Sequence, residues 1–327
     1  MRAYINNTIY IGQGVIQIIG NFLIFAVICG TKSLHRKEYV LPAALAVSDG
    51  ITGCGQFSAG TYRWYLLLTD QNSILQTTWQ CMWKPPSQFF LWGCYLVPTM
   101  LFLISVDRLI ACSSIRIYAS MRKSHMIGLV GAGIGVCCGL CGASLVVSYQ
   151  GIAKGPIYPK VCYLTYAMPP WFNAMVYWMY QFAMSAATIL LYGVAMIALR
   201  KTTTSEMSDI LKIKMERQIK VTRMLLIVMV CTLFMHTIPL GILVYYNFKK
   251  APVVVLNIII PTCWILVNFN SANNIIIYFV KNKDMRNGAC KILRFGSQAF
   301  KKFSRSETAV RSIDPTSSFT GQHKLRG

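Results

Sequence analysis

The chain has 327 residues, of which 55% are hydrophobic and only 13% are charged, and its formal net charge is +22. Soluble domains carry about 25% charged residues, so this composition argues against a water-soluble globular protein and favours one embedded in a membrane. A basic chain can also bind nucleic acid. Here, however, Lys and Arg are spread over the segments between apolar stretches, which argues against a nucleic-acid-binding module.

Seven apolar segments follow one another along the chain, and each exceeds the ~20 residues that a helix needs to cross a bilayer. They span about 9–30, 40–62, 86–111, 127–149, 172–199, 219–246 and 253–280. The first could be read as a signal peptide, but it lacks the short apolar core and small-residue cleavage site. None alternates as barrel strands do. We therefore predict an all-α integral membrane protein, a bundle of seven transmembrane helices.

The distribution of basic residues predicts the orientation. Of the 32 Lys and Arg, 25 lie in 31–39, 107–126, 199–223 and 281–327, which all fall on one side of a seven-helix bundle. Basic loops face the cytoplasm, so we expect a plasma-membrane protein with its C-terminus inside and its N-terminus outside. Residues 1–8 would be the extracellular N-terminus, 9–295 the helical domain, and 296–327 a disordered cytoplasmic tail.

Four residues are predicted sites of covalent modification. Cys81 and Cys162 fall in outside loops or helix tops, where an oxidising environment allows one disulfide between them. Asn6 starts an Asn-Asn-Thr glycosylation acceptor on the outside tail. Cys290, in the basic stretch after the last span, is a candidate for palmitoylation.

Polar residues inside the apolar segments predict an internal network. An acid at the bilayer centre costs about 2.5–3.5 kcal/mol on insertion scales, so Asp49 should face the bundle interior and find partners there. In the last segment, Asn270, Asn274 and Tyr278 recur every fourth residue and share one helix face. The predicted network comprises Asn21, Asp49, Asn270, Ser271 and Asn274. Alternatives are a protonated Asp49 that only packs, or an ionised Asp49 that binds an ion.

Three further features concern the cytoplasmic side of the bundle and the movement of its helices. Asp107 and Arg108 end the third segment, either as a membrane-exit charge pair or as a latch whose arginine changes partners when helices move. Pro239 predicts a kink in the sixth segment. Beyond Tyr278, one face of the basic stretch predicts a short amphipathic eighth helix in the inner interface. Its apolar residues are Met285, Ala289, Ile292 and Leu293.

These motifs, in this order, resemble those of rhodopsin-like G-protein-coupled receptors. The matching positions are Gly20-Asn21, Leu45 to Asp49, Asp107-Arg108-Leu109, Pro239, Asn270-Ser271 and Asn274 to Tyr278. Finer features are similar to nematode serpentine chemoreceptors of the srsx type. These features are Cys81-Met82-Trp83, Asp107 to Ala111, and the stretch LLYGVAMIALRK around Tyr192.

The resemblance implies a chemosensory receptor that transmits binding of an extracellular ligand, a small odorant-like molecule or a peptide, to a heterotrimeric G protein. By similarity, Arg108 would contact the G protein after the sixth helix swings out, and Tyr192 and Tyr278 would support that open state. The chain departs from the rhodopsin-like pattern at several positions, three of them motif residues, and these bear on the switch rather than on the fold. The three are Leu109 for the usual Tyr, Ile275 for the usual Pro and Thr237 for the usual Trp.

Aromatic residues gather in the outer halves of the helices and predict an apolar ligand pocket that includes Phe90, Tyr95 and Trp264. The outer helix halves carry no acid to pair with an amine, which argues against a monoamine ligand. The last helix has no lysine before Lys281, which excludes a retinal Schiff base.

A seven-helix transporter or ligand-gated channel is the alternative. Transporters show two related halves, whereas this sequence has no internal repeat and its polar residues form one compact seam. No Ser-His-Asp set, carboxylate pair or metal-ligand spacing occurs in the sequence. We therefore expect no enzyme activity, no metal and no cofactor.

Overall fold

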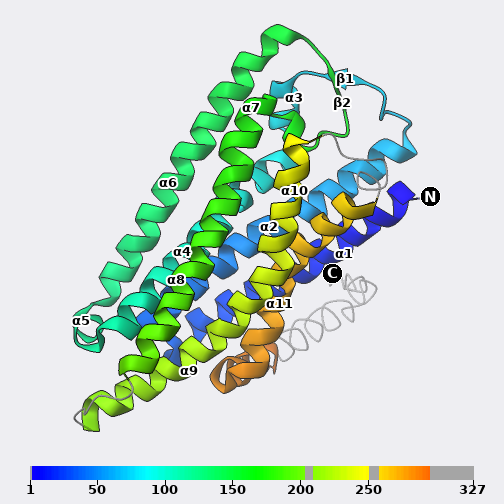
Figure 1. Cartoon of the computed structure of the whole chain (residues 1–327). Helices are drawn as coiled ribbons and strands as arrows, with labels where there is room; N and C mark the ends of the chain where they lie inside the picture. Colours follow the sequence, from blue (N-terminus) through cyan, green and yellow to red (C-terminus); the bar gives the residue numbers. More distant parts are fainter. Residues whose placement is uncertain (1, 203–208, 250–257, 295–327) are drawn as a thin grey trace, which may run out of the picture.

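The computed structural model describes residues 2–202, 209–249 and 258–294, and long helices that run side by side dominate it (Figure 1). In chain order they are α1 (Arg2–Gly30), α2 (Val40–Leu68), α4 (Pro85–Ser113), α6 (Lys123–Gln150), α8 (Met179–Thr202), α9 (Asp209–Thr232), α10 (Ile238–Phe248) and α11 (Ile260–Lys281). α1 begins at Arg2, so the expected extracellular segment 1–8 is largely helical. The predicted disordered tail, 296–327, lies outside the described residues.

Short elements connect the long helices at the two ends of the bundle. At one end lie η1 (Lys32–Leu34), η2 (Lys37–Tyr39) and α5 (Ile115–Ser120). At the other lie β1 (Leu75–Gln76), α3 (Thr78–Met82), η3 (Gly151–Lys154), β2 (Tyr158–Pro159), η4 (Leu164–Tyr166), α7 (Pro170–Phe172) and η5 (Asn173–Trp178). We call the first the Arg108 end and the second the disulfide end.

Six helical stretches of the described chain are long and apolar enough to cross a membrane. They are Tyr4–Gly30, Pro85–Ser113, Lys123–Ala153, Pro170–Lys201, Val221–Tyr246 and Thr262–Lys281. α2, which corresponds to the predicted span 40–62, is not among them, although it has the length. Its polar side chains lower its mean hydropathy. Three of them, Asp49, Gln56 and Arg63, are nevertheless buried inside the bundle rather than turned outward.

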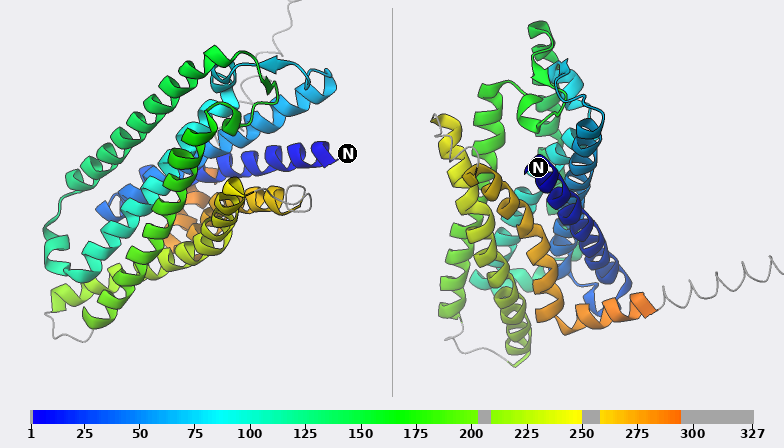
Figure 2. Two further views of the ribbon diagram at one scale, coloured as in Figure 1. Left: turned by 45° about the horizontal axis from the view of Figure 1, so that its top comes forward. Right: turned by 90° about the vertical axis from the view of Figure 1, so that its right-hand side faces the viewer.

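α4 is the central helix of the bundle. It packs against α2, α6, α8 and α9, and it buries Tyr95 and Arg108 completely. α11 closes the bundle by packing against α1 on one side and α9 and α10 on the other. α6 lies at the edge of the bundle (Figure 2). A side chain on the inward face of α4 therefore meets groups from several helices at once.

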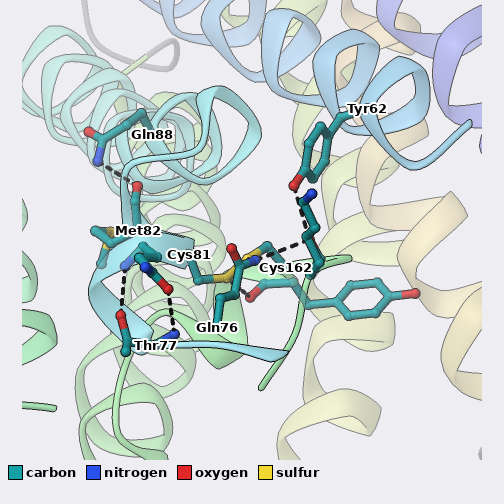
Figure 3. Close-up of a disulfide and its surroundings, with 10 residues drawn as sticks. Tyr62, Gln76, Thr77, Cys81, Met82, Gln88 and Cys162 are labelled. Atoms are coloured by element: carbon teal, nitrogen blue, oxygen red, sulfur yellow. Dashed lines mark hydrogen bonds between the residues drawn. A yellow bond between two sulfur atoms is a disulfide. The ribbon is translucent and has the colours of Figure 1, made fainter. Parts of the chain in front are cut away.

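The predicted disulfide between Cys81 and Cys162 is present, with their Cα atoms 5.4 Å apart (Figure 3). Beside it, β1 pairs with β2 in antiparallel register, a small exception to the all-helical prediction that satisfies the backbone of two loops. The hydroxyl of Tyr62 and the amide of Gln76 both donate to the carbonyl of Lys160, at 3.1 Å each. These bonds tie α2 and the two loops together.

At the Arg108 end, residues 283–294 form a further helix that turns sharply away from α11 (Figure 2). Asn282 starts it, because its side-chain oxygen accepts the backbone N–H groups of Asp284 and Met285 at 3.1 and 3.3 Å. Met285 and Ala289 are buried, but Leu293 is exposed and does not share their face. The placement of this helix in a membrane interface stays a proposal.

Gly288 explains how this helix approaches the end of α1. A Cβ at position 288 would lie only 2.6 Å from Oγ1 of Thr31 and 2.8 Å from Cγ1 of Val27. Glycine lowers helix propensity by up to about 1 kcal/mol relative to alanine. The close packing against α1 accounts for a glycine at this position.

We predict that Cys162→Ser lowers the free energy of unfolding of the purified protein by about 2–4 kcal/mol, because it frees the loop that the disulfide closes. Thermal unfolding in detergent measures the change. Cys138→Ser is the matched control, since Cys138 is an exposed free cysteine on α6. Equal unfolding midpoints for wild type and Cys162→Ser would contradict the prediction.

Candidate functional site

Asp49 lies at the centre of the bundle and links α2 to α11. Its carboxylate is buried and accepts the hydroxyl of Ser271 at 2.7 Å and the side-chain amide of Asn274 at 3.1 Å. A buried carboxylate is costly unless each oxygen has a donor, and here each oxygen has one. The structure thus brings together three members of the predicted network.

The other two members, Asn21 and Asn270, are buried but make different bonds. The amide of Asn21 donates to the carbonyl of Gln17 in its own helix, at 3.0 Å. The side-chain oxygen of Asn270 accepts the hydroxyl of Thr232 at 3.3 Å, which links α11 to α9. The polar seam is therefore two contacts along α11, one toward α2 and one toward α9, rather than a single cluster around Asp49.

Arg108 is buried at the opposite end of α4 from the disulfide. Its Nε donates to Oδ2 of Asp107 at 2.9 Å, and its Nη2 makes an ion pair with the same oxygen. The Arg108 side chain is fully buried, and Asp107 is 3% exposed. A simple membrane-exit pair would be solvated, so this burial favours the latch interpretation of the two residues.

Tyr118 completes this cluster, and the sequence analysis missed it. Nη2 of Arg108 donates to the hydroxyl of Tyr118 at 3.0 Å. Burial raises the pKa of the Tyr118 phenol, so it stays a neutral hydrogen-bonding partner. Lys37 holds this tyrosine: its Nζ donates to the backbone carbonyl of Tyr118 and, at 2.9 Å, to that of Met121, and it lies 4.2 Å from the Tyr118 ring centroid.

Tyr192 and Tyr278, which the resemblance implied as supporting residues, are also buried at this end. Tyr192 of α8 donates its hydroxyl to the backbone carbonyl of Thr222 in α9. The Thr222 side chain also faces Cys112 of α4, with Sγ and Oγ1 4.0 Å apart. The hydroxyl of Tyr278 is buried without a hydrogen-bond partner among the described residues. Thr222 is thus the position where α4, α8 and α9 meet.

Pro239 follows a break in regular α-helical geometry. Residues Leu233–Thr237 form a π-helical turn, η6, between α9 and α10, directly before the proline. Such turns mark places where a helix bends, which suits the kink predicted from Pro239. His236 in this turn is buried, and its Nδ1 lies 3.3 Å from the hydroxyl of Ser185 in α8.

A cavity of about 100 Å³ opens near the disulfide end. Phe90 of α4 and Trp264 of α11, both predicted pocket residues, line it. Tyr95 does not, because its ring packs edge-on against Tyr180 and its hydroxyl lies 3.0 Å from Oγ of Ser144. Its full lining is Tyr10, Arg63, Phe90, Tyr163, Leu164, Thr165, Trp264 and Asn268.

Arg63 was missed as a cavity residue because its position near the end of the second segment made it look like an outside-loop charge. It is 7% exposed, and its guanidinium carbon lies 4.2 Å from the Tyr163 ring centroid. Asn268 also lines the cavity, and its amide nitrogen has no partner among the described residues. The cavity therefore has apolar walls and polar donors.

The described residues contain no group of three or more His, Cys, Asp or Glu that could hold a metal ion. The arrangement is a central polar contact, a buried charge cluster at one end and a small cavity at the other. Such an arrangement suits binding at one end and a change of helix packing at the other.

A family model described as serpentine-type seven-transmembrane GPCR chemoreceptor Srsx matches residues 14–293. The chain belongs to the Srsx chemoreceptor family. The match covers α1 from residue 14, the other long helices and residues 283–293, so the seven-helix assignment includes α2 despite its polar side chains. No curated protein matches the chain.

Two departures of this Srsx protein from the rhodopsin-like pattern have local explanations. Ile275, where proline is usual, packs its side chain against Gly20 of α1. Leu109, where tyrosine is usual after Asp-Arg, packs toward Ala195 and Leu199 of α8. Both residues supply apolar contacts between helices.

We predict that Ser271→Ala lowers the free energy of unfolding by about 1–3 kcal/mol, because Oδ1 of Asp49 loses its donor while it stays buried. Ser48→Ala is the matched control, since Ser48 is also buried but bonds only to the Ala44 carbonyl of its own helix. Thermal unfolding of both purified variants measures the difference. An equal or larger loss for Ser48→Ala would contradict the assigned partnership.

Proposed function

We propose that this Srsx chemoreceptor is a G-protein-coupled receptor of the plasma membrane, in which ligand binding at the disulfide end releases Arg108 at the other end. The observation that carries the proposal is the fully buried Arg108, held by Asp107 and Tyr118. A charge enclosed in this way is suited to be uncovered by helix movement, when it can meet a partner protein.

The ligand would act through α4 and α11, which both reach the cavity. Phe90 and Arg108 lie on the same helix, 18 residues or about 27 Å apart. On α11, Trp264 lines the cavity and Asn270 bonds to Thr232 of α9. A ligand that shifts these two helices would therefore strain contacts that hold α9 in place.

Movement of α9 would have to break its side-chain contacts with three neighbouring helices. α9 is held to α8 by the bond from Tyr192 to Thr222, to α4 by Cys112, and to α11 by Thr232. Each is a single hydrogen bond or a weak thiol contact that contributes on the order of 1 kcal/mol. The free energy of ligand binding can therefore exceed the cost of breaking them. The π-helical turn before Pro239 supplies a flexible point between α9 and α10.

The basic residue distribution supports an extracellular disulfide end and a cytoplasmic Arg108 end. With that orientation, the glycosylation acceptor Asn6 is outside, in the first turns of α1. Residues 283–294 are at the inner membrane surface, where exposed Cys290 is available for palmitoylation. The partners would be a lipid membrane, a heterotrimeric G protein and an extracellular small molecule or peptide.

We predict that wild-type receptor in membranes stimulates nucleotide exchange on at least one member of a Gα panel, and that Arg108→Ala abolishes this activity at equal surface expression. Tyr118→Phe should instead raise basal exchange, up to about tenfold, because Arg108 loses a hydrogen bond worth about 1.5 kcal/mol. Exchange rates are measured with a fluorescent guanine nucleotide.

Tyr39→Phe is the matched control for Tyr118→Phe. It removes a tyrosine hydroxyl at the same end of the bundle, one that accepts the Asn282 amide at 3.0 Å and does not touch Arg108. Its basal exchange should equal that of wild type. Exchange that persists in Arg108→Ala would contradict the role of Arg108, and absence of exchange on every Gα would turn attention to ion flux and the channel or transporter alternative.

A further inference from the structure

Arg63 is a buried cation that faces the cavity without an acidic partner. Its side chain belongs to α2 and is 7% exposed, and it makes no ion pair within the described part of the chain. Its Nε is buried without a hydrogen-bond acceptor among the described residues. A guanidinium carries five N–H donors, so this group has unused capacity to bind an acceptor.

Among the described residues, no acid forms an ion pair with Arg63. Of the 10 Asp and Glu, Asp49 and Asp70 are those nearest to Arg63 along α2 and its end. Asp49 is 14 residues away on the same helix, about 21 Å, and is occupied by Ser271 and Asn274. Asp70 is exposed beyond the end of α2 and makes no ion pair with Arg63.

Two tyrosines compensate Arg63 in part, Tyr10 through a side-chain hydrogen bond and both Tyr10 and Tyr163 through their rings. Its guanidinium carbon lies 4.2 Å from the ring centroid of Tyr163 and 5.6 Å from that of Tyr10. Cation–π contacts and one neutral hydrogen bond stabilise a buried cation less than the burial of its full charge costs. The charge is therefore only partly compensated, and an anion in the cavity would remove the deficit.

The remaining lining fits an organic anion with an apolar part. The amide nitrogen of Asn268 is a buried donor without a partner, and Thr165 adds a second polar side chain. Phe90 and Trp264 supply apolar surface in the same cavity. Among the described residues that line the cavity, Arg63 is the only Lys or Arg, so a single negative charge matches this lining better than a phosphate dianion.

We propose that the cavity binds a small organic carboxylate, with its carboxylate on Arg63 and its apolar part against Phe90 and Trp264. The planar guanidinium suits two parallel N–H···O bonds to one carboxylate. This inference deepens the proposed function, since it takes the cavity as the ligand site and gives the ligand a chemical class. It does not depend on G-protein coupling, because binding is measured on the receptor alone.

The test compares carboxylates with their neutral isosteres on the purified full-length receptor. The probes are hexanoate, benzoate and phenylacetate, each beside its primary amide, and binding is measured by thermal stabilisation over a concentration series. At least one carboxylate should bind about tenfold or more tightly than its amide, and Arg63→Gln should abolish that difference. Arg63→Lys, which keeps the charge but loses the fork, should retain part of it.

Lys84→Gln is the matched control variant. Lys84 is also a cation at the disulfide end, 5.7 Å from the ring centroid of Tyr62, but it does not line the cavity. It should leave the carboxylate preference unchanged. The proposal is overturned if wild type binds no carboxylate more tightly than its amide, a comparison that needs no variant to fold. It is also overturned if Lys84→Gln loses the preference as Arg63→Gln does.

The outcomes separate this inference from the proposed function. A receptor that stimulates Gα through Arg108 but shows no carboxylate preference would retain the proposed function and lose the anion site. A receptor that binds carboxylates through Arg63 but stimulates no Gα would retain the anion site and lose the coupling. A purely structural Arg63, which only holds Tyr163 in place, predicts equal binding of carboxylates and amides to the wild-type receptor.

Discussion

The buried pair of Asp107 and Arg108 is the interaction on which the account of this receptor depends. Breaking a buried charge pair from one side costs several kcal/mol, so Arg108 stays with Asp107 and Tyr118 unless another environment receives it. In the proposed function, a G protein competes with these two residues for Arg108. Close to the pair in the chain, α4, α8 and α9 meet through weak contacts around Thr222, which can be exchanged at low cost.

The central helix α4 connects the two ends of the molecule. Near the disulfide end it contributes Phe90 to the cavity, and at the other end it carries Arg108. α11 runs in parallel as a second connection, with Trp264 in the cavity, Asn270 on α9, and Ser271 and Asn274 on Asp49. Because the polar contacts of α11 reach α1, α2 and α9, a small shift of α11 changes the packing of several helices together.

The sequence predicted the long helices, the disulfide, and the partnership of Asp49 with Ser271 and Asn274, because each rests on composition, topology or the cost of a buried acid. It could not predict Tyr118, whose hydroxyl reaches Arg108 only through the angle of the short helix α5. It misread Arg63, because the rotation of α2 decides whether a charge near a helix end faces water or a cavity. It assigned Asn21 to the central network, but a carbonyl of its own helix competes as the nearer partner.

The proposal that release of Arg108 lets α9 move is tested most directly by measuring the distance between α4 and α9 at the Arg108 end. Spin labels attached to genetically encoded keto residues at Ser113 and Arg223, both exposed, would report it by pulsed electron resonance without labelling the native cysteines. We expect a larger population of long distances in Asp107→Asn than in wild type, since Arg108 then lacks its buried counter-ion. Identical distance distributions in the two proteins would contradict the proposal that release of Arg108 accompanies a movement of α9 away from α4.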